Sequence, residues 1–113
     1  MKLAAVVWAA FLAGLPGFPQ EAAADREGIE FFEKKIRPVL VEKCFSCHSA
    51  RQGKRKGGLS MDTREEILRG GDRGPAVRPG DPEGSPLLRA IRYEDEEFKM
   101  PPRGRLTAAV VAD

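Results

Sequence analysis

The only two cysteines and the only histidine of this 113-residue chain fall within five consecutive residues, Cys44-Phe45-Ser46-Cys47-His48. Two thiols separated by two residues and followed at once by an imidazole form the attachment pattern of a c-type haem. Cys44 and Cys47 would form thioether bonds to the two vinyl groups on one edge of the porphyrin. His48 would then lie under the iron as an axial ligand, a position that helps to set the redox potential. The motif therefore predicts a covalently attached haem c.

Three other uses of these thiols fit the rest of the sequence less well. A structural zinc site needs four Cys or His ligands, and the chain offers three. A thioredoxin-like redox pair is expected inside a βαβ unit, and little of this sequence has the pattern of strands. A disulfide between Cys44 and Cys47 would close a very small loop and would stabilise the fold little. Haem attachment is the interpretation that uses the two thiols and the imidazole together.

An electron-transfer haem with low-spin iron needs a second axial ligand. Because His48 is the only histidine, a methionine is the next usual donor, and apart from Met1 the chain has Met61 and Met100. Met61 stands beside the start of an expected helix and could be a packed side chain. Met100 precedes Pro101-Pro102, which keep the following backbone extended and stiff. The sequence favours Met100 and leaves Met61 as the alternative.

The first 24 residues have the pattern of a secretory signal peptide. Lys2 supplies a short positive start, Leu3 to Leu15 is almost wholly apolar, and Ala22-Ala23-Ala24 offers a cleavage site. The apolar run is too short to span a bilayer comfortably, so a retained membrane anchor is the less favoured alternative. We therefore expect an exported protein of the periplasm or cell envelope, with one mature domain at residues 25–113.

The charge balance excludes some classes of partner. The chain has 19 basic and 17 acidic residues, a net charge of +2, which indicates neither nucleic acid nor an anionic membrane as partner. The basic, glycine-rich segment 49–58 could be a positive rim that docks an acidic redox partner protein. Charge runs are more often solvated loops, and this second interpretation is favoured.

The haem motif is expected to follow an amphipathic helix. Apolar side chains recur at steps of three and four residues, which is the period of a helix with one buried face. Pro38 interrupts the pattern and is expected to kink or restart the helix, because it removes one backbone hydrogen bond. The helix is expected over residues 27–43, with its core-facing stripe at Ile29, Phe32, Ile36 and Val39/Leu40.

Two shorter helices are expected beyond the motif. Thr63 has the position of an N-cap and Gly70 that of a terminator. Ser85-Pro86 has the pattern of a cap followed by a first helical residue, which predicts a helix ending at Arg92. Between them, residues 71–84 are rich in proline and glycine and are expected to form an irregular ordered loop.

Several of these segments together resemble the planctomycete-type cytochrome c domain, over about residues 29–107. The resemblance implies an all-α, class I-like cytochrome c fold in which short helices and loops wrap one covalent haem. It implies attachment at Cys44 and Cys47, and iron ligation by His48 and Met100. The matching segments are Phe31 to Leu40, Cys44 to His48, Gly57 to Asp62, Gly70 to Ala76, Pro79 to Pro82 and Lys99 to Pro102.

The C-terminal helix departs from that pattern. Residues 106–113 begin a helix with Thr107 as its cap, and this helix stops after about two turns. An isolated helix that short is marginal without packing. We expect a truncated helix in a fragment of a longer protein, in preference to a weakly closed domain, and further domains downstream in the same polypeptide.

The sequence thus predicts an electron carrier and not an enzyme, with redox proteins as its partners. No nucleophile, general base or cleft for a small-molecule substrate can be argued from the residues. Two alternatives stay open. One is a haem sensor or peroxide-binding site with a labile sixth ligand, and the other is a haem that is chiefly structural within a larger enzyme.

Overall fold

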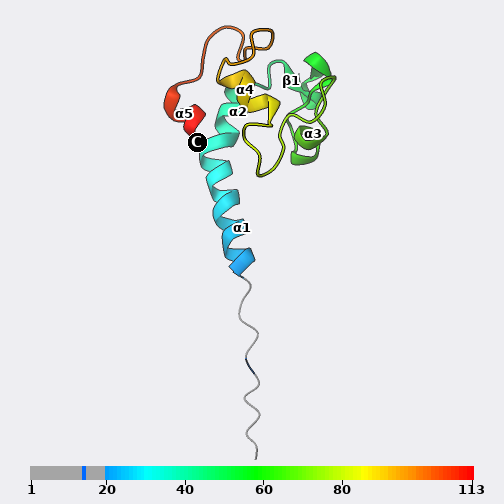
Figure 1. Cartoon of the computed structure of the whole chain (residues 1–113). Helices are drawn as coiled ribbons and strands as arrows, with labels where there is room; N and C mark the ends of the chain where they lie inside the picture. Colours follow the sequence, from blue (N-terminus) through cyan, green and yellow to red (C-terminus); the bar gives the residue numbers. More distant parts are fainter. Residues whose placement is uncertain (1–13, 15–19) are drawn as a thin grey trace, which may run out of the picture.

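The computed structural model describes residue 14 and residues 20–113, so most of the predicted signal peptide lies outside the described residues. Short helices, one small hairpin and long loops make up the described part, and the loops fold back beside α2 (Figure 1). Nowhere in this part is a helix long and apolar enough to cross a membrane.

The helix before the motif is interrupted as expected, and the interruption is a π-helical turn. Helix α1 (Gln20–Phe31) leads into η1 (Phe32–Ile36), and α2 (Arg37–Lys43) follows. Pro38 lies in the first turn of α2, where its missing N–H costs no helical bond. The π turn lets the chain pass the proline ring, since the N–H of Arg37 bonds to the carbonyl of Phe32, five residues back.

The predicted apolar stripe packs only along its second half. Leu40 is buried, and Phe32, Ile36 and Val39 are half-buried. Ile29 is 62 % exposed, so its placement in the core was wrong. The reason is that α1 extends away from the rest of the domain, as Figure 1 shows, and no other element among residues 20–113 covers it.

The basic loop after the motif is a tight hairpin, which the sequence did not predict. Strand β1 (His48–Ser49) pairs antiparallel with β2 (Lys54–Arg55), with His48 opposite Arg55. A 3-10 turn, η2 (Ala50–Gln52), joins them, and a second, η3 (Lys56–Gly58), follows. The expectation of an all-α fold is therefore only partly correct, because a two-stranded sheet stands among the helices.

Local capping signals placed the next helix correctly. Helix α3 (Arg64–Arg69) begins with a capping box, in which the Thr63 hydroxyl accepts from the Glu66 N–H and the Glu66 carboxylate accepts from the Thr63 N–H. Gly70 ends the helix with a φ of +73°, a conformation that favours glycine. The following loop returns to the hairpin, where the N–H of Asp72 donates to the carbonyl of Gly57 at 2.8 Å.

Helix α4 (Pro86–Ile91) begins at Pro86 as expected, but Ser85 does not cap it with its side chain. The Ser85 hydroxyl instead accepts from the N–H of Arg78 at 2.9 Å and donates to the carbonyl of Asp81 at 2.8 Å. Ser85 therefore fastens the preceding proline-rich loop to the helix start. The last helix, α5 (Ala108–Ala112), has the expected cap, since the Thr107 hydroxyl accepts from the N–H of Val110.

Few side chains of the described part are fully buried. Three of them are serines, Ser49, Ser60 and Ser85, each 1 % exposed. The buried apolar set has only four members, Leu40, Met61, Ala76 and Ala90. Hydrogen bonds between loops therefore organise this domain as much as apolar packing does.

Candidate haem-binding site

The motif continues the last turn of α2. The N–H groups of Cys44 and Phe45 both donate to the carbonyl of Leu40, at 2.9 and 3.0 Å. The N–H groups of Cys47 and His48 then donate to the carbonyl of Cys44, at 3.1 and 2.9 Å. Residues three apart on such a turn lie on the same side of the chain. The two thiols are thus held as neighbours, with the imidazole one residue further on.

The imidazole of His48 is oriented by a backbone carbonyl. Its Nδ1 lies 3.3 Å from the carbonyl oxygen of Leu59. A carbonyl can only accept, so Nδ1 carries the proton in this contact, and Nε2 is the nitrogen with the lone pair in the neutral imidazole. A ligating histidine is commonly held in this way, with one ring nitrogen donating to the protein and the other free for the metal.

Both thiols are free and half-buried. The pKa of the Cys44 thiol is raised above its ordinary value. Burial of the thiol is the main cause, and the neighbouring Cys47 is the second. No disulfide joins the pair, and no group of three or more His, Cys, Asp or Glu side chains in the described residues could hold a metal ion. The donor set of two free thiols and one oriented imidazole fits a covalent haem.

Asp62 joins the hairpin to the segment that carries Leu59. One carboxylate oxygen accepts from the hydroxyl of Ser49 at 2.6 Å. The other accepts from the N–H of Arg51 at 2.9 Å and from the hydroxyl of Ser60 at 3.3 Å. The bonds from Ser49 and Arg51 are the main reason that the pKa of Asp62 lies below its usual value. No role could be assigned to Asp62 from the sequence, although it belongs to a segment that carries the family resemblance.

The two methionines have different surroundings. Met61 is only 3 % exposed, and its N–H donates to the carbonyl of His48 at 2.9 Å. Met61 is therefore a buried side chain whose backbone is tied to that of His48. Met100 is half-buried and lies in a loop with no regular structure, where its N–H donates to the carbonyl of Ala90 at 3.1 Å.

The loop that carries Met100 is fastened to its neighbours. The hydroxyl of Tyr93 donates to the carbonyl of Pro101, directly after Met100. On the other side, the guanidinium of Arg73 lies 3.6 Å from the ring centre of Phe98 and donates to Asp95 at 3.0 Å. These contacts come from residues that the sequence left unassigned, because they depend on segments brought together only by the fold.

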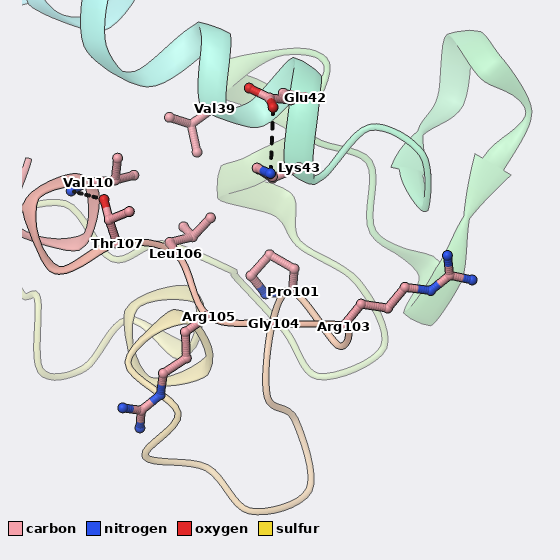
Figure 2. A pocket seen from close by; sticks show the side chains of 10 residues that line it. All are labelled: Val39, Glu42, Lys43, Pro101, Arg103, Gly104, Arg105, Leu106, Thr107 and Val110. Carbon is pink, nitrogen blue, oxygen red and sulfur yellow. Dashed lines mark hydrogen bonds and ion pairs between the residues drawn. The ribbon is translucent and has the colours of Figure 1, made fainter.

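A pocket of about 370 Å³ lies between α2 and the segment that follows Met100 (Figure 2). Lys43, the residue before Cys44, lines it from one side, and Pro101, the residue after Met100, lines it from the other. Figure 2 also shows Val39 of α2 facing the same hollow as Leu106. The segments that carry the first thiol and the favoured methionine thus border one cavity.

Comparison with known proteins agrees with this geometry. The family model of planctomycete cytochrome C matches residues 44–104, from the first thiol of the motif to just beyond Met100, and the chain belongs to this family. Neither the curated proteins nor the solved structures contain a significant match to the chain. The cytochrome c family implies covalent haem c, and the cysteines at 44 and 47 fit its attachment motif.

Proposed function

We propose that this chain is an exported electron-transfer domain that carries one haem c with His48 and Met100 as axial ligands. When bound, such a haem supplies one-electron Fe(II)/Fe(III) chemistry. Cys44 and Cys47 anchor it, and the protein around it fixes the ligands and the burial of the group. Its partners are redox proteins outside the cytoplasm. The domain that carries this function spans residues 25–113.

The observation that carries the proposal is the orientation of His48. Its Nδ1 is bound to the carbonyl of Leu59 at 3.3 Å, which leaves Nε2 as the nitrogen with a free lone pair. Cys44 and Cys47 precede it as free, half-buried thiols on one helical turn. Covalent attachment of a haem uses the two thiols and the imidazole together.

The surroundings of the two methionines support Met100 as the second ligand. A second protein ligand would have to reach the haem from a segment other than the one that holds His48. Met61 is buried, and its backbone is hydrogen-bonded to that of His48. Met100 lies on a separate loop that Ala90 and Tyr93 hold from outside the motif.

The test is absorption spectroscopy on the chain produced with c-type haem maturation, alongside Met100→Leu and Met61→Leu. The two variants carry the same volume-conserving change, which on its own costs little stability. We expect covalent haem in all three proteins and a low-spin spectrum in the parent. The weak charge-transfer band of methionine-ligated ferric haem should disappear only in Met100→Leu.

Other outcomes would overturn particular parts of the proposal. A parent chain without covalent haem would remove the cofactor and return the two cysteines to other chemistry. Covalent haem that is high-spin, and indifferent to both substitutions, would favour a sensor or peroxide-binding site with an open sixth position. Loss of the band in Met61→Leu alone would exchange the two methionines.

A further inference from the structure

The hydrogen bond that orients His48 joins two segments that are not consecutive in the chain. His48 lies in β1, and Leu59 lies in the segment after η3, which runs beside β1. Two hydrogen bonds from backbone N–H groups hold these segments together: the Met61 N–H donates to the His48 carbonyl at 2.9 Å, and the Ala50 N–H donates to the Ser60 hydroxyl at 3.0 Å. The position of the Leu59 carbonyl therefore depends on the register between segments 48–51 and 59–62.

Asp62 is the side chain that fixes this register. Its carboxylate accepts from Ser49 and from the N–H of Arg51 on the first segment, and from Ser60 on the second. Ser49 and Ser60 are each 1 % exposed, so water does not compete freely for these hydroxyls. Hydrogen bonds to an ionised acceptor are about twice as strong as neutral ones. A single carboxylate thus carries more of the contact than any other side chain in it.

We propose that Asp62 is a positioning residue for the iron ligand, acting on His48 through the carbonyl of Leu59. This inference rests on the proposed ligation by His48. The carboxylate holds the Leu59 carbonyl in line with Nδ1, and this bond sets both the rotation of the imidazole and the basicity of its Nε2. The partners of a metal-bound histidine tune the metal in this way, through the second ring nitrogen.

The consequence concerns the redox potential. A strong hydrogen bond at Nδ1 makes Nε2 a better electron donor, which favours Fe(III) and lowers the potential. When Asp62 is replaced, the 59–62 segment shifts relative to β1 and the bond at Nδ1 weakens. The potential then rises, and the Nδ1 proton exchanges with solvent more readily.

The experiment uses the haem-loaded chain and the substitution Asp62→Asn, which keeps the shape of the side chain and removes its charge. Hydrogen exchange of the His48 Nδ1 proton is followed by NMR in the diamagnetic reduced state, and the reduction potential is measured by spectroelectrochemistry. We expect exchange about tenfold faster, the change that corresponds to losing one ordinary hydrogen bond. We also expect a potential above that of the parent.

The matched control is Asp81→Asn. The Asp81 carboxylate accepts a hydrogen bond from the N–H of Gly84 at 2.9 Å. Both residues lie outside segments 48–51 and 59–62, so the substitution should change neither the Nδ1 exchange nor the potential. If Asp62 serves stability alone, both variants should melt at a lower temperature and keep the parent's Nδ1 exchange rate and reduction potential. This result would overturn the proposal.

Two further variants decide the question if Asp62→Asn does not fold. Ser60→Ala and Ser49→Ala each remove one hydrogen bond to the carboxylate and leave the charge in place. Each should give a smaller rise in the exchange rate and in the potential, and parent values in both would contradict the proposal. A parent chain without covalent haem is a different result, because it refutes the ligation by His48 itself.

Discussion

At the scale of single residues, Asp95 links two loops by an ion pair. Its carboxylate accepts from Arg73 at 3.0 Å and from the N–H of Glu97 at 3.1 Å. The hydrogen bond from Arg73 is the first cause that holds the pKa of Asp95 below its usual value. The segment leading to Met100 is thus fastened to the loop after α3 by a group that must stay ionised.

This gives a prediction for the pH dependence of stability. Because the pKa of Asp95 is lower in the folded state, its contribution is complete above the unfolded value of about 3.9 and is lost as the pH falls through the folded pKa. Asp95→Asn should lower the melting temperature of the haem-loaded chain at neutral pH. The gap between variant and parent should close as the pH falls below that range. A gap that stays constant, or widens in acid, would show that the ion pair does not stabilise the fold.

The residues of the site could be predicted from the sequence to different extents. Cys44, Cys47 and His48 form a contiguous motif whose spacing has one chemical reason, and the family match begins at Cys44. Met100 was favoured on the stiffness of the prolines after it, and its ligation stays a prediction. Asp62 was missed because its partners, Ser49 and Arg51, are more than ten residues away in the chain.

At the scale of elements, the loop after α3 packs backbone to backbone against η3. A Cβ atom built on Gly71 would clash with the carbonyl oxygen of Gly57 and would lie 2.9 Å from the backbone nitrogen of Leu59. Backbone atoms held by the Asp72 to Gly57 hydrogen bond cannot move aside easily. Only glycine therefore allows this approach, which in turn supports the segment that carries the Leu59 carbonyl.

Gly71→Ala is accordingly expected to destabilise the domain by about 2 kcal/mol or more, in the upper range for single substitutions. Gly104→Ala is the control, because no atom lies within 4 Å of its added Cβ; its effect should stay within about 0.5 kcal/mol. Denaturant unfolding of both haem-loaded variants measures the difference. Equal stabilities would mean that the loop relaxes without cost.

Elements with local signals were predicted well, and those that depend on distant contacts were not. The capping box of Thr63 and the terminator Gly70 act within a few residues, so α3 could be recognised at both ends. The β1–β2 hairpin has no alternation of apolar and polar residues in its sequence. Its pairing is extended by a hydrogen bond between the residues that flank the two strands, from the Lys56 N–H to the Cys47 carbonyl. Ser85 was expected to cap α4, but its hydroxyl bonds to the preceding loop instead, which its sequence position could not reveal.

At the scale of the whole molecule, the small buried set predicts that folding depends on the cofactor. The described residues include four buried apolar side chains, two of which are alanines. A domain of this size buries only a modest core on its own. A porphyrin held by the two thioether bonds would add a large apolar surface against the half-buried side chains of α2 and the loops.

The double variant Cys44→Ala/Cys47→Ala, which cannot attach haem, should therefore lose its fixed tertiary packing. We expect helical signal in far-ultraviolet circular dichroism, poor dispersion in the amide NMR spectrum and a broad thermal transition. The haem-loaded parent should show good dispersion and a sharp transition. A haem-free chain that melts sharply near the temperature of the parent would show that the polypeptide core is sufficient.

The exposed course of α1 has a consequence for processing. Cleavage after Ala24 would leave Asp25 as the first residue and would put a new positive amino group at the positive end of the helix dipole. This repulsion would destabilise the helix by about 0.3–1 kcal/mol, and the Asp25 carboxylate would partly offset it. The seven residues left before η1 are all exposed. The end of a helix frays in water where nothing packs against it. The processed protein would then begin with a frayed leader, and its ordered domain would start near Phe32.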